Sequence, residues 1–236
     1  MGNRYSRQVG YLGREAQEAI ERSSAAVVGC GALGNVASSL LARMNFSRVR
    51  LIDSDVVEES NLPRCVLFGQ DDVGRKKAGV LEKRLRKIGS DTRIEVMEER
   101  LSLRNLKLLD GFDVVVDCTD SMKSRRLING FCVEKGIPWV YGALTEDEGF
   151  VASFRGRPCF SCLFPEGKSP RKDLESNTRI FSPLPAMMGS LQAAQAVRIA
   201  TGRSRFGGLY HLSLRDMSLR TSVIRPDPHC RACGKR

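Results

Sequence analysis

Four of the eight cysteines stand in two C-x-x-C pairs, Cys159 with Cys162 and Cys230 with Cys233. This spacing lets both sulfurs of a pair reach one metal ion, and two pairs complete a tetrahedral set of four thiolates. The pattern predicts a structural zinc site that would tie the C-terminal tail to the chain around residue 160. A redox dithiol is the alternative. We disfavour it because there are two pairs and because we expect neither to open a helix in a thioredoxin-like βαβ unit.

A glycine-rich turn near the N-terminus, Gly29-Cys30-Gly31-Ala32-Leu33-Gly34, follows a short apolar run and precedes a helical pattern. Glycines let such a turn approach a phosphate closely, and the N-terminus of the following helix offers free N–H groups and positive potential. Asp53 ends the next predicted strand, where a carboxylate can accept hydrogen bonds from a ribose. The turn alone predicts a nucleotide site and places NAD- or FAD-dependent enzymes first.

The residues that follow carry charges for which a dehydrogenase has no use. Asp53 opens an acidic turn that runs on to Arg64, Lys77 begins a predicted helix, and Asp120 follows a later apolar run. Arg64 and Lys77 could stabilise negative charge that develops on phosphates, and Asp120 could hold Mg²⁺ through its oxygens. The set therefore favours nucleotidyl transfer. Lys76, which is adjacent, could bind the phosphate in place of Lys77. Arg64 could instead form an ordinary ion pair at the surface.

Alternating elements must position these residues. Over residues 1–143 apolar runs alternate with helical patterns, which predicts a doubly wound parallel sheet. Strands are expected before Gly29 and at 49–53, 93–97, 112–118 and 137–143, and helices at 10–21, 74–89, 102–109 and 121–136. Beyond residue 143 we expect a hairpin over 150–160 with its turn at 155–157, a long loop over 165–183, a helix over 184–202, and strands at 208–214 and 219–224.

The expected fold class is therefore α/β, with a Rossmann-like, mostly parallel twisted sheet, antiparallel strands at its C-terminal end and a zinc site of four cysteines. We expect a single domain over 1–236. Its nucleotide-binding half spans 1–143, and an antiparallel extension with the loop and the zinc knuckles spans 144–236.

Composition narrows the class of protein. Apolar residues are 42% and charged residues 28% of 236, which excludes a disordered chain, a collagen-like repeat and a disulfide miniprotein. The sequence has no apolar run of about 18 residues and begins with a polar segment, so we expect a cytoplasmic protein without a membrane partner. A net charge of +11 suits an anionic partner, but aromatic residues at 6% are few for a nucleic-acid surface, so nucleic acid is not expected as a partner.

The motifs together resemble the E1-like adenylyltransferases of the ThiF/MoeB/HesA family, which activate ubiquitin-like sulfur-carrier proteins. Besides the two cysteine pairs, the matching segments are RYSRQ at 4–8, GCGALG at 29–34, DSDVVEESNLPR at 53–64, VGRKKA at 73–78, CTDS at 118–121 and GSLQAAQAVR at 189–198. The resemblance implies that the C-terminal carboxylate of a carrier ending in Gly-Gly attacks the α-phosphate of MgATP. Pyrophosphate leaves, and a carboxyl-adenylate stays bound. Positioning and charge neutralisation suffice for this step.

The resemblance also implies the site residues and cofactors. The nucleotide would lie against four residues of the glycine-rich turn, namely Gly29, Gly31, Ala32 and Gly34, with its ribose on Asp53. The phosphates would face Ser60, Asn61, Arg64 and Lys77, and Mg²⁺ would bind Asp120 directly or through water, beside Ser121. Arg7 matches an arginine that the family inserts from the other subunit of a homodimer; its plainer interpretation is an exposed arginine. The implied cofactors are ATP, Mg²⁺ and Zn²⁺.

The chain departs from the family pattern in three places. Many relatives carry a loop cysteine that bonds covalently to the carrier, but here no cysteine lies between Cys162 and Cys230, and the matching position is near residues 174–175. We therefore expect no thioester step there and a separate sulfurtransferase downstream. Cys65 replaces a glutamine of the family, and Ser121 replaces an asparagine. Beside Arg64, Cys65 could have a lowered pKa and act as a nucleophile, whereas a packed thiol is the plainer interpretation.

Three other functions stay open. The chain could be an NAD- or FAD-dependent oxidoreductase, for which nicotinamide binding without ATP binding would speak. It could adenylate a tRNA-linked carboxylate, as the cyclic-threonylcarbamoyladenosine dehydratases do. It could also be a zinc-dependent module that docks a ubiquitin-like fold without turnover. The sequence does not name the carrier, which could serve molybdopterin, thiamin, tRNA thiolation or protein conjugation.

Overall fold

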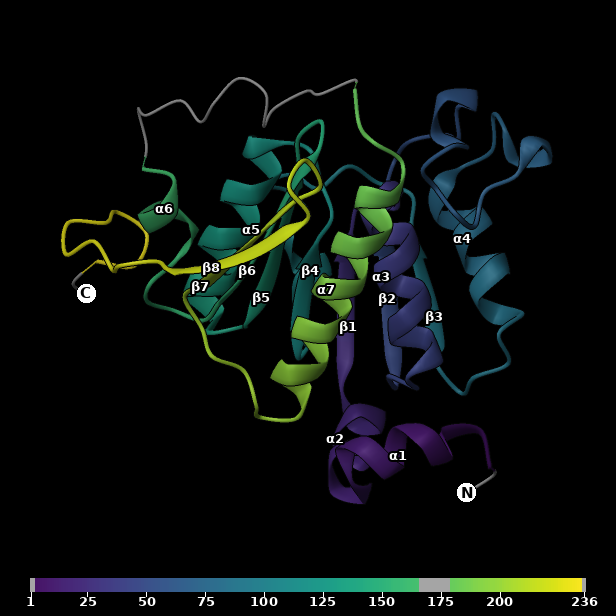
Figure 1. The fold of residues 1–236 in the computed structure, drawn as a ribbon, viewed down its shortest axis with the longest axis horizontal. Helices are drawn as coiled ribbons and strands as arrows, with labels where there is room; N and C mark the ends of the chain where they lie inside the picture. Colours follow the sequence, from purple (N-terminus) through teal and green to yellow (C-terminus); the bar gives the residue numbers. More distant parts are fainter. Residues whose placement is uncertain (1–2, 166–178, 235–236) are drawn as a thin grey trace.

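The computed structural model describes residues 3–165 and 179–234. Their strands form one twisted sheet in the order β3-β2-β1-β4-β5-β6-β7-β8 (Figure 1). Strands β1 to β5 pair in parallel, and β5 to β8 pair antiparallel. The predicted fold class, a mostly parallel Rossmann-like sheet with antiparallel C-terminal strands, is confirmed.

The strands lie close to where the sequence predicts them. They are β1 (Ser24–Val28), β2 (Arg48–Ile52), β3 (Arg93–Met97), β4 (Val114–Asp117), β5 (Trp139–Leu144), β6 (Glu148–Phe154), β7 (Gly208–Ser213) and β8 (Ser218–Val223). Every residue of β1 and β4 is buried, because helices cover both faces of the parallel half. Strand β8 forms one edge of the sheet and is exposed along most of its length.

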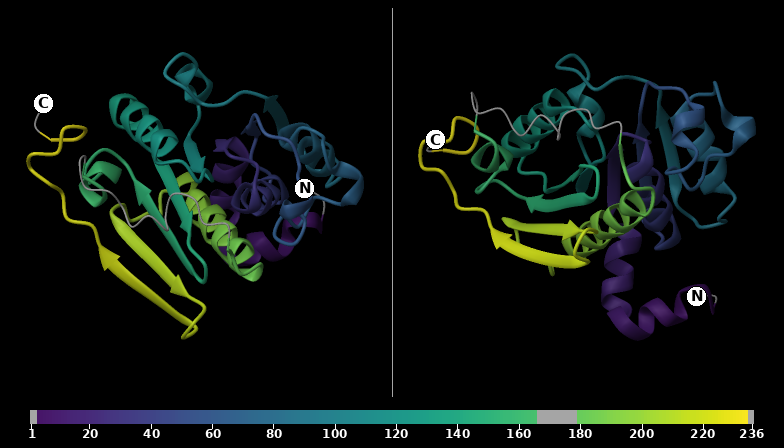
Figure 2. Two further views of the ribbon diagram at one scale, coloured as in Figure 1. Left: turned by 90° about the horizontal axis from the view of Figure 1, so that it is seen from above. Right: turned by 45° about the horizontal axis from the view of Figure 1, so that its top comes forward.

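The helices divide between the two faces of the sheet. The α-helices are α1 (Ser6–Leu12), α2 (Arg14–Arg22), α3 (Ala32–Arg43), α4 (Lys77–Arg86), α5 (Met122–Lys135), α6 (Phe160–Leu163) and α7 (Pro183–Ala200). The 3₁₀ turns are η1 (Asn3–Tyr5), η2 (Glu59–Asn61), η3 (Gln70–Asp72) and η4 (Leu106–Leu109). Helices α3, α4 and α7 share one apolar core with one face of the sheet, and α5 packs on the other, as Figure 2 shows for α5 and α7.

The predicted hairpin over residues 150–160 is wrong. Strand β6 ends at Phe154 and lies between β5 and β7, so its partner strands come from elsewhere in the chain. The segment after it turns, and Phe160 enters the core, with ring centroids 5.8 Å from Trp139 and 5.2 Å from Tyr141. The apolar residues at 159–160 suggest a strand by composition, but they are buried as the start of a short helix.

Two further expectations need adjustment, and a third is largely untested. The helix expected at 10–21 is two helices, because Gly13 takes a positive φ of 88° between them. The helix expected at 102–109 is the single 3₁₀ turn η4. Most of the loop expected at 165–183 lies outside the described residues, and α7 begins at Pro183. Within the described part of the chain, no helix is both long and apolar enough to cross a lipid bilayer.

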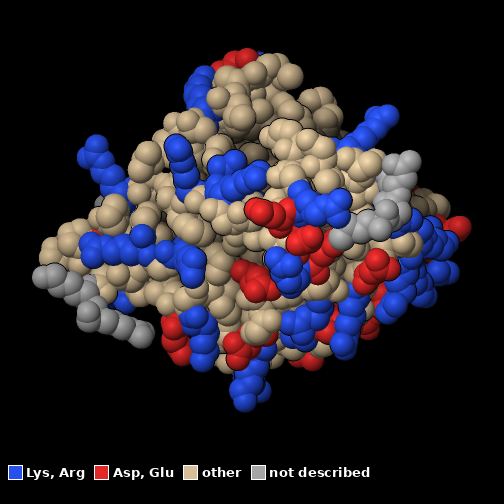
Figure 3. All heavy atoms as spheres, turned by 90° about the horizontal axis from the view of Figure 1, so that it is seen from below, with Lys and Arg blue, Asp and Glu red and all other residues tan. Residues whose placement is uncertain are grey.

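Figure 3 shows the molecule turned by 90° from the view of Figure 1, so that it is seen from below. Lys and Arg side chains are spread over this face, and acidic side chains lie among them. The net charge of the whole chain is +11, and on this face the basic side chains do not form one uniformly basic patch.

Candidate nucleotide site and cysteine cluster

Three polar turns meet at the carboxyl ends of the parallel strands. In the sheet register, Val28 at the end of β1 stands opposite Ile52 of β2 and Asp117 of β4. The glycine-rich turn, the turn beginning at Asp53 and the turn over 118–121 therefore leave the sheet side by side. Strand order reverses between β1 and β4, and open α/β sheets bind ligands at such a switch point.

The glycines of the glycine-rich turn have different structural roles. Gly29 has a φ of +92°, and a Cβ there would lie 2.7 Å from the carbonyl oxygen of Cys118. A Cβ on Gly34 would lie only 1.9 Å from the carbonyl oxygen of Gly29, so this glycine lets α3 pack against the turn. Gly31, in contrast, has no described neighbour within 4 Å of a Cβ and takes an ordinary φ of −74°. Gly29 and Gly34 build the turn, and Gly31 leaves the helix N-terminus accessible.

Alanine substitutions should separate the packing role of Gly34 from the ligand-facing role of Gly31. We expect Gly34→Ala to destabilise the fold by about 3 kcal/mol or more, since helix α3 would have to move away from β1. Gly31→Ala should fold with a melting temperature within a few degrees of wild type and weaken nucleotide binding instead. Thermal unfolding and titration with ATP check both variants. Equal stability of the two proteins would contradict this division.

The Asp53 carboxylate connects the first two turns. One oxygen accepts a hydrogen bond from the backbone N–H of Cys30 at 2.6 Å, and the other accepts one from the N–H of Asp55 at 2.7 Å. Asp53 is therefore fixed at the end of β2 and holds the glycine-rich turn in place. Each carboxylate oxygen has a second lone pair, so the group can still accept a hydrogen bond from a ligand hydroxyl.

Two adjacent lysines at the start of α4 face different surroundings. The Lys77 side chain is only 13% exposed, and its Nζ lies 3.4 Å from an oxygen of Asp55. Its charge also acts on the buried thiols of Cys30 and Cys65. Lys76 is exposed, and its Nζ donates to the carbonyl of Ser54 at 2.5 Å. Lys77 thus lies beside the glycine-rich turn, whereas Lys76 caps a surface turn.

Arg64 and Cys65 follow the turn η2. The Arg64 guanidinium donates to the carbonyl of Ser60, and its charge acts on the neighbouring thiol. Burial raises the pKa of Cys65 in spite of the positive charges of Arg64 and Lys77, and the residue is 1% exposed. The expectation of a lowered pKa is wrong, because burial outweighs the two cations. The plainer interpretation, a packed thiol, is confirmed.

Ser60 and Asn61 shape the same turn. The buried Asn61 accepts the N–H of Glu58 on Oδ1 at 3.2 Å and donates to Ser60 Oγ at 3.4 Å. Ser60 Oγ in turn donates to the Glu58 carboxylate at 3.2 Å. Ser60 is exposed and open to a ligand, whereas the Asn61 carbonyl oxygen is used to fold the turn.

Asp120 and Ser121 lie on the third turn, at the start of α5. Ser121 caps this helix by accepting the N–H of Ser124 at 3.3 Å. Asp120 is exposed, and its negative charge acts on the buried Asp117. Burial raises the pKa of Asp117 to about 6, although the guanidinium of Arg125 opposes the shift.

Three residues beneath this turn are not among the predicted site residues: Asp117, Arg125 and Gln192. All three are buried and polar. The sequence signal for them is limited to Asp117, which ends a run of valines. The burial of Arg125 on α5 and of Gln192 on α7 emerges only from the fold. Charged and amide side chains at buried positions mark a polar network.

Arg7 is the predicted site residue that the single chain does not bring to the others. It lies exposed on α1, which precedes the N-terminal end of β1. The three turns leave from the carboxyl ends of the strands, so α1 and these turns are at opposite ends of the sheet (Figure 1). A role for Arg7 in this chain's own site is therefore excluded by position, and a role in the site of a second copy stays a prediction.

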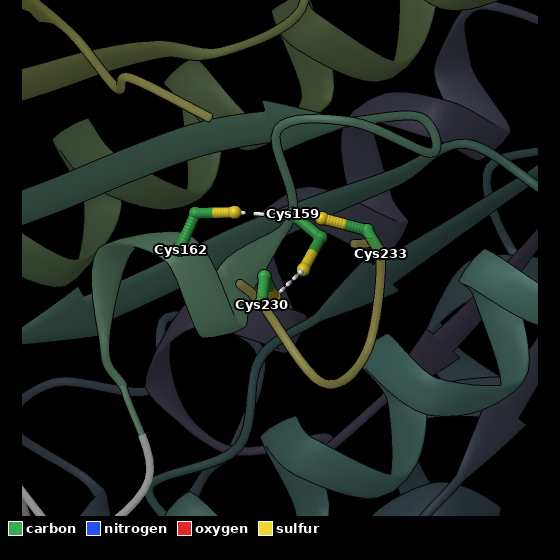
Figure 4. Close-up of side chains that lie close together, drawn as sticks. All are labelled: Cys159, Cys162, Cys230 and Cys233. Atoms are coloured by element: carbon green, nitrogen blue, oxygen red, sulfur yellow. Dashed lines mark hydrogen bonds between the residues drawn. The ribbon is translucent and has the colours of Figure 1, made fainter. Parts of the chain in front are cut away.

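The two cysteine pairs come together as one cluster (Figure 4). The four sulfurs all lie within 4.8 Å of one another, with 3.7 Å between Cys159 and Cys230 and 3.4 Å between Cys162 and Cys233. Four thiolates around Zn²⁺ at 2.3 Å would stand about 3.8 Å apart, so the cluster has the size of a tetrahedral site. Its residue types and geometry fit zinc.

Neighbouring groups orient the cluster. Asn129 of α5 donates to the Cys159 sulfur at 3.7 Å and accepts the N–H of Phe160 at 3.0 Å. The N–H of Asp227 donates to the Cys162 sulfur at 3.4 Å. Hydrogen bonds of this kind, made to the ligating atoms, hold metal-binding groups in position. Cys159 directly precedes the four-residue helix α6. The gathering of four sulfurs favours a metal over a dithiol.

The remaining cysteines are core residues, as expected. Cys30, Cys118 and Cys132 are buried, and burial raises the pKa of each thiol. They lie in the two apolar cores on either side of the sheet.

Comparison with known proteins shows the family to which this chain belongs. The ThiF family model matches residues 5–232, and the chain belongs to this family. The sulfur carrier protein adenylyltransferase of Thermus thermophilus is 36% identical over 98% of this chain and 90% of its own length. The SAMP-activating enzyme E1 of Haloferax volcanii is 35% identical, over 99% of this chain and 89% of its own.

The fold also matches a solved structure, that of E. coli MccB with MccA-N7isoASN. The TM-score is 0.88 with 21% identity, over 99% of this chain and 76% of that one. The predicted family is thus confirmed, and the names of the relatives agree with the predicted enzyme class, an adenylyltransferase.

Proposed function

We propose that this protein adenylates the C-terminal glycine carboxylate of a ubiquitin-like sulfur-carrier protein and releases pyrophosphate. The observation that carries the proposal is the meeting of the glycine-rich turn, Asp53, Lys77 and the Asp120 turn at the carboxyl ends of β1, β2 and β4. The relatives named above, a sulfur carrier adenylyltransferase and a SAMP-activating enzyme, support the carrier as substrate.

The chain's residues would act on ATP by position and charge. Gly31 and the free N–H groups at the start of α3 receive phosphate, and Asp53 accepts a ribose hydroxyl. Arg64 and Lys77 neutralise charge on the phosphates as the carrier's carboxylate oxygen bonds to the α-phosphorus and the bond to the leaving pyrophosphate breaks. Because Lys77 faces the glycine-rich turn and Lys76 the surface, we assign this role to Lys77.

Two metal ions belong to the proposal. Asp120, exposed at the end of the third turn, would hold Mg²⁺, which screens the triphosphate charge when bound, with Ser121 beside it. Cys159, Cys162, Cys230 and Cys233 would hold Zn²⁺ in a structural role, since four thiolates leave no open coordination position.

The assembly and the later chemistry are also proposals. We propose a cytoplasmic homodimer in which Arg7 reaches the site of its partner, and a single domain over 1–236 in which residues 1–143 bind the nucleotide. Between Cys162 and Cys230 the sequence offers no cysteine, so we propose that the enzyme stops at the adenylate and forms no thioester in that segment.

The exchange of labelled pyrophosphate into ATP tests the reaction. We expect exchange that requires the enzyme, Mg²⁺ and a small carrier protein ending in Gly-Gly, and none with the same carrier shortened by its last two residues. Exchange absent with every Gly-Gly carrier offered would overturn the proposal, and binding of nicotinamide nucleotides without ATP binding would favour an oxidoreductase instead.

A further inference from the structure

The loop that carries Asp120 is held from below by a buried polar network. We call this network the Arg125 clamp; it consists of Asp117, Arg125 and Gln192. Arg125 is 2% exposed and Asp117 and Gln192 are fully buried, so all three lie under the turn rather than in contact with solvent. Asp120 itself is exposed. Its backbone position therefore depends on the groups that hold residues 117–119.

Arg125 connects the Asp120 turn to the next strand. Its Nη2 donates to the carbonyl of Thr119 at 2.8 Å and to the carbonyl of Gly142, on β5, at 3.3 Å. The guanidinium also stacks on Tyr141 of β5, with 5.2 Å from Cζ to the ring centroid. The residue immediately before Asp120 is thus tied to the centre of the sheet by a planar, rigid group.

Asp117 and Gln192 fix the other polar atoms of the turn. Asp117 Oδ1 accepts the N–H of Thr119 at 3.0 Å and its hydroxyl at 2.7 Å. Gln192 Nε2, from α7, donates to the carbonyl of Asp117 at 2.6 Å, and its Oε1 lies 3.5 Å from the Cys118 sulfur. Gly142 makes room for this amide, because a Cβ there would lie 2.4 Å from Gln192 Nε2.

The free energy of folding does not by itself explain why this network is present. Arg125 Nε lies 3.7 Å from Asp117 Oδ2, too far for a strong charge-assisted hydrogen bond, and burying two charges generally costs as much as their attraction returns. What the arrangement does achieve is a fixed backbone at Thr119. A carboxylate that must meet a metal-bound triphosphate needs such a fixed backbone.

We propose that Arg125 is a positioning residue for Asp120: by holding the Thr119 carbonyl against β5 it sets where the Asp120 carboxylate stands. The inference rests on the proposed function, in which Asp120 holds Mg²⁺. Arg125 acts through the backbone of the turn and is not itself a ligand of the nucleotide.

The test compares Arg125→Lys with Arg126→Lys. A lysine at 125 keeps the charge but loses the rigid, planar guanidinium, whose Nη2 donates to both carbonyls. Arg126 is the matched control, because it is next in the same helix and makes one long hydrogen bond, 3.4 Å to the carbonyl of Phe164. In pyrophosphate exchange we expect Arg125→Lys to lower kcat about 10–100-fold, as loss of a group that orients a metal ligand does in other proteins. The Mg²⁺ concentration for half-maximal rate should rise, and KM for ATP should change less than about threefold.

A double-mutant comparison asks whether Arg125 acts through Asp120. If it does, Arg125→Lys adds little to the loss already caused by Asp120→Asn. Losses that multiply, or an unchanged Mg²⁺ half-saturation in Arg125→Lys, would overturn the inference. Should Arg125→Lys fail to fold, Gln192→Met removes the bond to the Asp117 carbonyl with a side chain of similar length and is judged by the same Mg²⁺ readout.

Hydrogen exchange separates this inference from the proposed function. We expect the backbone amides of residues 118–121 to exchange faster in Arg125→Lys than in Arg126→Lys, whatever the substrate is. Equal protection in the two variants would overturn the clamp. Absence of pyrophosphate exchange by the wild type, together with the expected difference in protection, would overturn the proposed function while leaving the clamp in place.

Discussion

Lys77→Ala and Arg64→Ala are each expected to lower the rate of pyrophosphate exchange about 10²–10³-fold. Removing a group that stabilises charge in the transition state usually has an effect of this size. Lys77 lies beside the glycine-rich turn, where its charge reaches the thiols of both Cys30 and Cys65. Removing it takes away a cation that is already in place before the nucleotide binds. The loss should fall mainly on kcat, because the charge it neutralises grows in the transition state.

The adjacent lysine provides the control for that experiment. Lys76→Ala should keep exchange within a few-fold of wild type, because its ammonium group binds the carbonyl of Ser54 at the surface. Neither lysine variant should lose more than about 1 kcal/mol of stability, since the partner of Lys77, Asp55, is an exposed carboxylate. Larger losses in Lys76→Ala than in Lys77→Ala would reverse the assignment between them.

Asp120→Ala should be as inactive as Lys77→Ala and remain folded. Its carboxylate is exposed, so substitution leaves no buried cavity. Circular dichroism and melting temperature check the fold, and pyrophosphate exchange checks activity. Wild-type exchange in a folded Asp120→Ala protein would remove the residue from the proposed site.

The parallel half of the fold can be predicted from the sequence, because its central strands are marked by short apolar runs. Residues 25–28 of β1 and 114–116 of β4 are runs of alanine and valine, which is typical of parallel strands buried on both faces. The C-terminal half is less readable. Phe160 has the composition of a strand residue, but its place is decided by contacts with Trp139 and Tyr141, which lie on a strand distant in the sequence.

The candidate site shows the same division. The glycine-rich turn, Asp53 and the cysteine pairs are predictable, since their spacing along the chain carries the chemistry. The choice between Lys76 and Lys77 is not, because it depends on which side of α4 faces the turn. The Arg125 clamp cannot be predicted from the sequence either. Its hydrogen bonds join α5 and α7 to two strands, and these elements come together only in the folded chain.

Removal of the metal from the cysteine cluster is the second change for which we expect a large effect. The cluster joins residues 159–162, beside α5, to residues 230–233 near the C-terminus, and the segment between β8 and Cys230 is largely exposed. Of residues 224–230, only Ile224 and Cys230 are buried. Since metal binding by four thiolates contributes about 10 kcal/mol or more to small zinc folds, the tail should depend on the ion.

We expect one zinc ion per chain in protein purified without chelators, and close to none in Cys230→Ser. The matched control is Cys132→Ala, which removes a buried thiol of α5 that lies outside the cluster and should keep the full zinc content while losing some core packing. In Cys230→Ser the amides of residues 225–234 should lose their protection from hydrogen exchange, whereas those of β1 and β4 should keep theirs. That contrast follows from the architecture, because the central strands are buried between helices without help from the metal. A wild-type protein free of zinc, or a Cys230→Ser protein that retains it, would show that the four sulfurs meet for another reason.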